Sequence, residues 1–351
     1  MGWKGLRILA AMPSLGVRFS SKEVRMASQV QSYMASGKTV CVTGANGFIA
    51  SWLVKLLLER GYTVKGTIRN AEKSKHLLNL PGASERLQLI EADLLKPGAF
   101  DSAVQGCDGV FHTASPFFYN VTDPDAELLD PAVKGTLNVL ESCAKARTKK
   151  IVLTSSVAAV AYTPKRIGAS VVDESFFSDI DLCRKEQRWY VLSKTLAELA
   201  AWDFVKEHNL NMVAVNPTMV LGPLLQACMN SSNELLLEYL NGTSKSFPNL
   251  AVGWVGVEDV ALAHLLVYEN PKSEGRYICN ERVLHYGDFV SLLSKLYPQY
   301  PVVAKDADDS PRIPAHELSN EKLKNLGLTF RSLEEVVHET VACLKELKYL
   351  E

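Results

Sequence analysis

Tyr190 and Lys194 stand four residues apart in a segment whose apolar residues recur at helical spacing. The two side chains therefore lie on one face of the expected helix, one turn apart. An ammonium group beside a phenol favours the phenolate and lowers the pKa of the phenol from its ordinary value of about 10. Such a pair could donate a proton to a substrate near neutral pH. Tyr-x-x-x-Lys also arises by chance in helices, where Tyr190 would be an ordinary half-buried aromatic.

A hydroxyl-rich segment, Thr154-Ser155-Ser156, follows the apolar run 151–153 at the end of an expected strand. Open parallel α/β sheets bind ligands at the carboxyl ends of their strands, which favours a functional role for this segment. A serine hydroxyl there could donate a hydrogen bond to a carbonyl oxygen and stabilise the charge that develops on it. The alternative is a polar strand end that caps the next segment.

A glycine-containing turn, Gly44-Ala45-Asn46-Gly47-Phe48-Ile49-Ala50, connects the expected strand 39–42 to an expected helix. Close approach of backbone N–H groups to a pyrophosphate at a helix N-terminus requires residues without side chains, which Gly44 and Gly47 supply. Ala50 permits tight packing of the helix on the sheet. Because a strand precedes the turn and a helix follows it, the pattern predicts dinucleotide binding. A plain turn glycine would not explain this spacing.

The end of the second expected strand indicates which dinucleotide binds. NAD-binding proteins usually place a carboxylate there for the ribose 2′-hydroxyl, whereas this chain has Arg69, followed by Lys73 and Lys75. A guanidinium can bind a phosphate through two hydrogen bonds, and a lysine adds positive charge. We therefore predict NADP(H), although these residues could also be solvated surface bases. Asp93, after the third expected strand, could accept a hydrogen bond from adenine or cap the next segment.

The elements that must position these residues alternate between strands and helices. Strands are expected over 39–42, 63–68, 87–90, 110–113, 151–154 and 212–215, and the main helices over 128–146 and 190–206. Such alternation predicts an α/β fold of the Rossmann type, a doubly wound parallel sheet covered on both faces. After Pro217 the pattern loosens. We expect a dinucleotide-binding domain over 38–217, rejoined by 251–268, and a smaller, interleaved substrate region over 218–250 and 269–351.

The first 37 residues differ in composition from the rest. They carry a single acid, Glu23, and five basic residues: Lys4, Arg7, Arg18, Lys22 and Arg25. This is typical of an organelle transit peptide. An unstructured extension produced by an upstream start is the alternative that we favour, because Met26 and Met34 could each act as initiator. Either way the segment is expected to lie outside the fold.

Composition excludes several classes of protein. The 38 basic and 39 acidic side chains give a net charge of −1, which argues against nucleic-acid binding. No apolar run approaches the roughly 20 residues that span a bilayer. The seven cysteines form no Cys-x-x-Cys pair and no histidine cluster has ligand spacing, so neither a disulfide framework nor a metal site is indicated. A reducing compartment, the cytoplasm, is the expected location, with an organelle as the alternative.

Together these motifs resemble the extended short-chain dehydrogenase/reductases, and more narrowly the plant dihydroflavonol reductase and cinnamoyl-CoA reductase group with its phenylacetaldehyde-reductase-like branch. The resemblance runs from about Lys38 to the C-terminus. It rests on these segments: VTGANGFIASWLVKLLLERGYTVKGTIRN, GVFHTASPF, DPAVKGTLNVLESCAK, VLTSSVAAVAY, VVDESFFSD, WYVLSKTLAE, NPTMVLGPLLQ and RYICNERVLH.

The resemblance implies roles for particular residues. Ser156 would be the catalytic serine, Tyr190 the proton donor and Lys194 the residue that orients the nicotinamide ribose. Arg69 and Lys73 would hold the 2′-phosphate, with Lys75 as an alternative to Lys73. The implied cofactor contacts are Gly44, Asn46, Gly47, Phe48, Ile49, Arg69 and Lys73 at the phosphates, Asp93 and Leu94 at adenine, Thr113, Ala114 and Ser115 at the ribose, Tyr190 and Lys194 at the reacting centre, and Pro217, Thr218, Met219, Val220 and Ser232 at the nicotinamide.

Departures from the family pattern bear on the substrate. Cinnamoyl-CoA reductases usually carry Asn-Trp-Tyr-Cys-Tyr-Gly-Lys where this chain reads Arg188-Trp-Tyr-Val-Leu-Ser-Lys194, and dihydroflavonol reductases usually carry Val-Ala-Thr-Pro where it reads Thr113-Ala-Ser-Pro116. We therefore predict NADPH-dependent reduction of an aromatic aldehyde or ketone to an alcohol. The alternatives are a cinnamoyl-CoA or dihydroflavonol reductase proper, a nucleotide-sugar epimerase or dehydratase, and a non-catalytic NADP sensor. Residues 116–121 and the segments after Pro217 should shape the substrate pocket.

Two further polar residues fall near the expected site. His112, in the fourth expected strand, is expected to be a hydrogen-bonded core histidine rather than a ligand. Asn138, in the expected helix 128–146, could support Tyr190 through a water molecule, or could be an ordinary buried amide.

Overall fold

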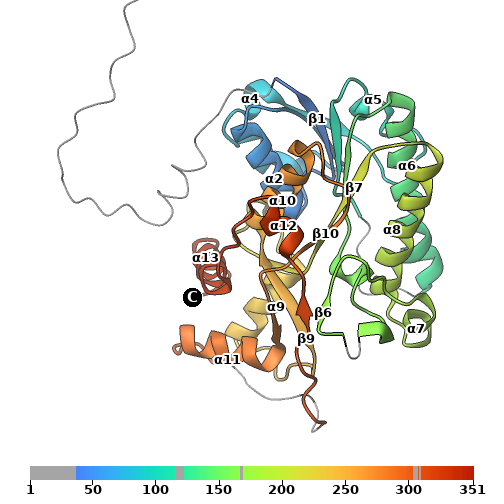
Figure 1. The fold of residues 1–351 in the computed structure, drawn as a ribbon. Coiled ribbons are helices and arrows are strands. Elements are labelled where there is room, and N and C mark those ends of the chain that lie inside the picture. The colour runs from blue at the N-terminus through green and yellow to red at the C-terminus, as the bar shows by residue number, and fades with distance from the viewer. Residues whose placement is uncertain (1–36, 116–121, 167–168, 303–306, 308–309) are drawn as a thin grey trace, which may run out of the picture.

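The computed structural model describes residues 37–115, 122–166, 169–302, 307 and 310–351. Its centre is a sheet of seven parallel strands (Figure 1). In spatial order these are β10 (Gly275–Cys279), β7 (Met212–Pro217), β5 (Ile151–Thr154), β4 (Gly109–His112), β1 (Thr39–Thr43), β2 (Thr63–Ile68) and β3 (Leu87–Glu91). The inner strands β1, β4, β5 and β7 are buried along almost their whole length, which explains why they are continuous apolar runs.

Helices cover both faces of this sheet. One face packs against α2 (Phe48–Glu59) and α10 (Val257–Glu269), through side chains such as Leu53 and Val260. The other packs against α5 (Asp101–Val104), α6 (Asp130–Ala146) and α8 (Trp189–Glu207), through side chains such as Leu140 and Ala201. Figure 1 shows the two layers on opposite sides of the strands. The predicted doubly wound Rossmann sheet is confirmed.

The strand order reverses direction between β1 and β4. From β1 the chain proceeds outward through β2 to β3, and then returns to the other side of β1 and proceeds through β4 and β5 to β7. Ligands of doubly wound sheets bind at such a switch point, beyond the carboxyl ends of the strands. The turn that begins at Gly44 follows β1 and the segment Thr113–Ser115 follows β4, so the topology brings these two predicted cofactor segments together.

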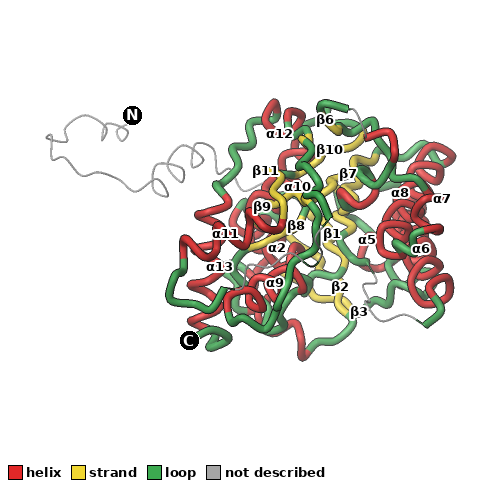
Figure 2. Tube along the Cα trace, turned by 90° about the horizontal axis from the view of Figure 1, so that it is seen from below, coloured by secondary structure: helices red, strands yellow, loops and turns green. Residues whose placement is uncertain are grey.

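A second unit lies below the central sheet in Figure 1 and beside it in Figure 2. It has a three-stranded sheet of β11 (Arg282–His285), β9 (Ala251–Gly256) and β8 (Met219–Leu221). Three helices, α9 (Ser231–Leu240), α11 (Tyr286–Leu296) and α13 (Leu333–Glu346), share a separate apolar core with this sheet, which includes Trp254 and Phe289. Apart from β9, this unit lies within the region expected to hold the substrate.

The remaining elements are short. The strands β6 (Val171–Val172) and β12 (Glu317–Leu318) pair in parallel and join the two parts of the chain. The short helices are η1 (Glu72–Ser74), α3 (Lys75–Leu78), α4 (Ala83–Arg86), the π-helix η2 (Asp125–Leu129), η3 (Val157–Ala159), η4 (Pro164–Arg166), α7 (Ile180–Lys185) and α12 (Glu321–Asn325).

Two of the expected domain boundaries need correction. Residues 269–351 were assigned to the substrate region, yet Gly275–Cys279 forms the edge strand β10 of the central sheet, paired with β7. Residues 251–268 were expected to rejoin the dinucleotide-binding domain; α10 does so, whereas β9 belongs to the three-stranded sheet. β10 pairs with β7 across about 60 residues, and β9 pairs with β8 and β11 across about 30 residues. Strand pairing at such separations leaves no local sequence signal, which explains both errors. The N-terminal extension, apart from Gly37, lies outside the described residues.

Candidate active site

A cavity of about 540 Å³ opens at the switch point of the central sheet. The predicted residues that line it are Gly44, Asn46, Gly47, Arg69, Asp93, Leu94, Thr113, Ala114 and Ser115. Residues that sequence reasoning missed complete its walls: Thr67, Ile68, Ala92, Leu95, Phe100, Ala126, Glu127 and Pro131. Thr67, Ile68 and Ala92 end or follow strands, a position that could have identified them. Ala126 and Glu127 belong to the π-helix η2, which has no comparable signal.

The turn after β1 is built for close approach by a ligand. Gly44 has φ +62°, a conformation that side chains disfavour, and a Cβ on it would lie 3.1 Å from the Cα and Cβ of Ala114. The Gly47 N–H donates to the Gly44 carbonyl at 2.9 Å, and the Gly44 N–H donates to Thr67 Oγ1 at 3.1 Å. Helix α2 begins at Phe48, so its N-terminus faces the cavity edge formed by Gly44 and Gly47.

The basic residues after β2 lie on the surface at this cavity. Arg69 is exposed and lines the cavity. Asn70 holds the following turn, since its Oδ1 accepts the Glu72 N–H and its carbonyl accepts Ser74 Oγ, both at 2.9 Å. That turn carries Lys73, which is exposed in η1. Lys75 instead forms an ion pair with Glu72, with 2.6 Å between Nζ and Oε2. This favours Lys73 over Lys75 as the lysine that would bind the 2′-phosphate together with Arg69.

The hydroxyl of Thr43, at the end of β1, fixes the segment after β4. Thr43 Oγ1 accepts the N–H groups of Thr113 and Ala114, at 3.1 and 3.0 Å, and lies 2.9 Å from His112 Nδ1. With both lone pairs used, the hydroxyl donates its hydrogen to His112, whose ring is neutral because burial lowers its pKa to about 3. His112 is thus a core residue, as predicted, although its Nε2 has no hydrogen-bond partner within the described part of the chain.

The wall expected to face adenine is also fixed by polar contacts. Asp93 Oδ1 accepts the N–H of Leu95 at 3.0 Å, so the side chain caps this segment while it lines the cavity. Asn138 Nδ2 donates to the Leu94 carbonyl at 2.9 Å, and its predicted support of Tyr190 through a water molecule stays a prediction. A Cβ on Gly135 of α6 would lie 2.5 Å from Leu94 Cγ, so this glycine admits the Leu94 side chain.

A second, much smaller cavity of about 10 Å³ shares Ala114 and Ser115 with the first and reaches Lys194. Lys194 Nζ lies 3.4 Å from Ser115 Oγ and 3.5 Å from the Thr154 carbonyl oxygen. Burial lowers the pKa of Lys194 to about 8. Lys194 therefore extends from α8 to Ser115 in the wall of the predicted cofactor cavity. Tyr190, in the first turn of the same helix, is 39% exposed.

Ser156 stands beside the same helix. It comes two residues after the end of β5 and is the N-cap of η3, which packs against α8. Ser156 Oγ accepts the N–H of Ala158 at 3.1 Å, which leaves its own hydrogen to be donated to an acceptor. The structure thus brings Lys194 to the carboxyl end of β5, with Ser156 in the segment that follows this strand and Tyr190 one turn before Lys194 on α8.

The residues predicted at the nicotinamide end occupy the crossover to the second unit. Pro217 ends β7, Thr218 donates its N–H to the Cys279 carbonyl at 3.1 Å, and Met219 and Val220 begin β8. Ser232 Oγ donates to the Val220 carbonyl at 2.5 Å. None of these residues, nor Phe48, Ile49 or Lys73, lines the large cavity, so their cofactor contacts stay predictions. Residues 116–121, expected to shape the substrate pocket, lie outside the described residues.

The arrangement fits an NADP(H) molecule. The glycine turn is a cradle that a Cβ would fill, an α-helix N-terminus stands behind it, and Arg69 stands at the end of β2, where NAD-binding proteins usually carry a carboxylate. In the described parts of the chain no three His, Cys, Asp or Glu side chains could together hold a metal ion. The same parts contain no helix of the length and apolar character needed to cross a membrane.

Comparison with known proteins identifies relatives along nearly the whole chain. A cinnamoyl-CoA reductase of Medicago truncatula is 57% identical over 318 residues, which cover 89% of this chain and 97% of the relative. The crystal structure of vestitone reductase from alfalfa superposes with a TM-score of 0.77 at 34% identity, over 89% of this chain and all of the other. Yeast methylglyoxal/isovaleraldehyde reductase, crystallised with NADPH, gives 0.76 at 31% identity with the same coverage.

The resemblance stated from the motifs is therefore confirmed along the chain from β1 onward. The sequence model of one family, described as the NAD dependent epimerase/dehydratase family, matches residues 40–280. That range contains the glycine turn, the β5–α8 junction, the whole of α10 and all seven strands of the central sheet apart from Thr39, the first residue of β1. This chain belongs to the NAD-dependent epimerase/dehydratase family.

Proposed function

We propose that this protein uses NADPH to reduce the carbonyl group of a small aromatic substrate. The observation that carries the proposal is that two neighbouring cavities share a wall at Ala114 and Ser115. The large one begins at the glycine turn and Arg69, and the small one, which shares Ala114 and Ser115 with it, ends at Lys194. A dinucleotide held by its phosphates at the first would extend its reactive ring toward the β5–α8 junction. The relatives support this assignment, because all three are named as reductases.

In the proposed reaction NADPH, when bound, supplies a hydride to the carbonyl carbon. Ser156 Oγ donates a hydrogen bond to the carbonyl oxygen and stabilises its developing negative charge. Tyr190 Oη donates the proton that this oxygen takes up. Lys194 Nζ, positively charged below a pH of about 8, lies close to the ribose-facing segment at Ser115 and orients the cofactor there. An aldehyde or ketone is thereby converted to an alcohol.

The chemical class of the carbonyl is the finer part of the proposal. Residues 188–194 depart from the motif usual in cinnamoyl-CoA reductases, which favours an aldehyde or ketone. The identity of 57% to a cinnamoyl-CoA reductase supports a thioester as the second candidate. Reduction of a thioester would release an aldehyde and a free thiol, whereas reduction of an aldehyde releases only an alcohol. The second unit, with α9, α11 and α13, would form the substrate side of the site.

The cysteines bear on the location of the protein in the cell. All seven cysteines are free thiols, a state that a reducing compartment maintains, and we propose the cytoplasm.

A substrate panel tests the proposal. The purified protein should oxidise NADPH in the presence of an aromatic aldehyde, a dihydroflavonol or cinnamoyl-CoA, with a thiol reagent recording any release of coenzyme A. Tyr190→Phe should lose most of this activity, since it removes only the proton donor. Tyr349→Phe is the matched control, because its hydroxyl binds the distant Ala227 carbonyl. Full activity of Tyr190→Phe would refute the mechanism, and cofactor binding without turnover on every carbonyl would favour an NADP sensor.

A further inference from the structure

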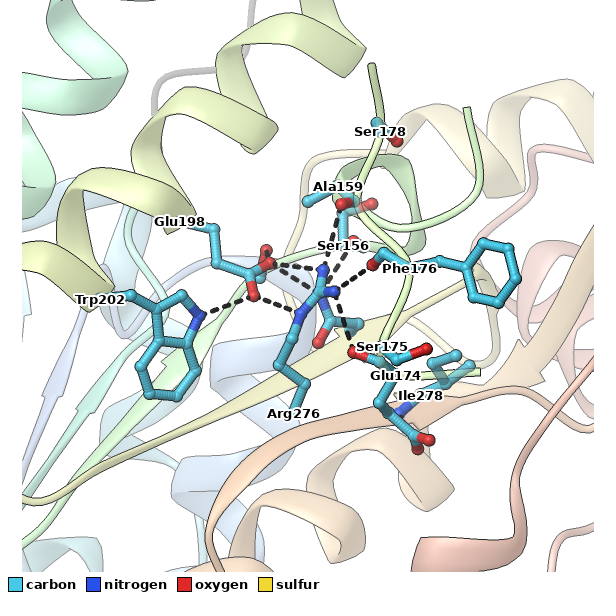
Figure 3. A network of polar contacts seen from close by, with 12 residues as sticks. Ser156, Ala159, Glu174, Ser175, Phe176, Ser178, Glu198, Trp202, Arg276 and Ile278 are labelled. Carbon is cyan, nitrogen blue, oxygen red and sulfur yellow. Dashed lines mark hydrogen bonds and ion pairs between the residues drawn. The ribbon is translucent and has the colours of Figure 1, made fainter. Parts of the chain in front are cut away.

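A buried ion pair lies directly behind the proposed catalytic residues. Glu198 stands on α8, one turn after Lys194, and Arg276 stands on β10 (Figure 3). Arg276 Nε donates to Glu198 Oε1 at 2.6 Å and Nη2 donates to Oε2 at 3.3 Å. The side chain of Glu198 is 0% exposed and that of Arg276 is 6% exposed. The pair therefore joins the catalytic helix to the edge strand of the central sheet inside the core.

The Glu198 carboxylate also binds the segment that carries Ser156. It accepts Ser155 Oγ at 2.5 Å and Asn216 Nδ2 at 2.9 Å, through Oε2 in both cases. Asn216 Nδ2 in turn lies 3.1 Å from the carbonyl oxygen of Ser156, to which it also donates. A third donor, Trp202 Nε1, binds Oε1 at 3.0 Å. The carboxylate thus links α8 to the Ser155 side chain directly and to the Ser156 carbonyl through Asn216.

The Arg276 guanidinium completes the attachment from the other side. Nη2 donates to the carbonyl of Ala159, in η3, at 3.1 Å. Nη1 donates to the carbonyls of Phe176 and, at 3.2 Å, Glu174. The guanidinium carbon also lies 3.9 Å from the centre of the Phe177 ring. Arg276 therefore holds Ala159, the last residue of η3, and the loop 174–177. Ser156 stands at the other end of η3, directly before its first residue.

Stability alone does not explain this arrangement. Each buried ion costs several kcal/mol to desolvate, and apolar residues of similar volume in place of a buried pair are often neutral or stabilising. The contacts of this pair instead converge on residues 155–159, the segment between β5 and the end of η3. We therefore expect these contacts to determine the position of the segment, because its only regular element is the single turn of η3.

We infer that Glu198 and Arg276 are positioning residues that hold the Ser156 hydroxyl in register with Tyr190 and Lys194. The inference rests on the proposed function, since it assigns the pair a role in the same reaction. Neither residue lines the large cavity, whereas Glu198 lines the small one together with Lys194. The contacts that link the pair to the Ser156 segment run through residues 155–159. Displacement of a reacting group by about 1 Å can reduce a rate on the order of 100-fold. Loss of the pair should therefore reduce kcat and leave the KM for NADPH almost unchanged.

The test replaces the pair without leaving a buried charge. In the double variant Glu198→Met with Arg276→Met, we expect kcat to fall roughly 10–100-fold, with the KM for NADPH within about twofold of that of the parent. Ser155→Ala, which removes one hydroxyl and keeps the ion pair, should reduce kcat by a smaller factor and decides the question if the double variant does not fold. The matched control is Arg282→Met with Glu334→Met, which removes a two-bond ion pair in the second unit.

Hydrogen exchange separates this inference from the proposed function. Backbone amides of residues 157–161 should exchange faster in the double variant, while those of β1 and β2 keep the parental rate. This measurement needs no substrate, so it reads the positioning contacts even if the parent reduces no carbonyl and the proposed function fails. Parental kcat in both Ser155→Ala and the folded double variant would overturn the inference. A fall in kcat with unchanged exchange of residues 157–161 would also overturn it.

Discussion

Replacement of Arg69 by glutamine is the sharpest test of the cofactor assignment. Arg69 follows β2, is exposed and lines the large cavity, and the 2′-phosphate of NADP(H) is the anion that it would bind there. A hydrogen bond to a charged group contributes about 1.5–3 kcal/mol, and solvent exposure places Arg69 in the lower part of that range. We therefore expect Arg69→Gln to raise the KM for NADPH about 10–30-fold, since about 1.4 kcal/mol corresponds to a factor of ten.

NADH provides the internal control, because it lacks the phosphate. Initial rates measured with a saturating carbonyl should show the KM for NADH within about twofold of the parental value in Arg69→Gln. Lys73→Gln should produce a smaller rise in the KM for NADPH alone, and Lys75→Gln almost none, since Lys75 is paired with Glu72. Equal increases for both cofactors in Arg69→Gln would show that Arg69 supports the fold of the cavity rather than the phosphate, and would refute the reasoning.

Three further predictions follow from individual groups. Gly44→Ala should weaken NADPH binding in fluorescence titration and lower Tm more than Gly106→Ala, which has a similar positive φ but open space around its Cβ. Activity should decline as the pH rises through about 8, the pKa of Lys194, with the decline moved to higher pH in Lys194→Arg; a flat profile would contradict this. Burial lowers the pKa of His264 to about 4, so between pH 7 and 5 the unfolded state binds more protons and His264 should reduce the free energy of unfolding by about 2 kcal/mol. Because the buried His112 adds a similar loss, urea titrations of His264→Gln should show this fall reduced by about 2 kcal/mol and not abolished.

Local patterns predicted most of the central sheet. Six strands and the helices α6 and α8 agree with the expected ranges to within about two residues, because buried parallel strands are short apolar runs and the helices between them have their own period. The strand β10 was missed for a physical reason: its register with β7 depends on residues more than 60 positions away. Residues 251–256, expected to rejoin the dinucleotide-binding domain, form β9 of the three-stranded sheet instead, because the partners β8 and β11 lie about 30 residues before and after it.

The cofactor cavity was largely predictable because each of its walls follows a strand. Gly44, Arg69, Asp93 and Thr113 come directly or almost directly after β1, β2, β3 and β4, and parallel strands end at one edge of the sheet. Position relative to a strand was thus a sufficient guide. It fails for the walls from η2, such as Glu127, which reach the cavity from a helix that begins far from any strand end.

Glu198 shows what residue spacing cannot reveal. A glutamate four residues after Lys194 on a helix suggests an exposed i,i+4 pair, the common arrangement of such charges. Its partner in the structure is instead Arg276, 78 residues further along the chain, on the strand that sequence reasoning had missed. The two oversights have one cause, because only the pairing of β10 with β7 brings Arg276 against α8. A residue that positions the catalytic serine thus became recognisable only when the edge of the sheet was known, and substitution of the pair should affect kcat in proportion to how far residues 155–159 move.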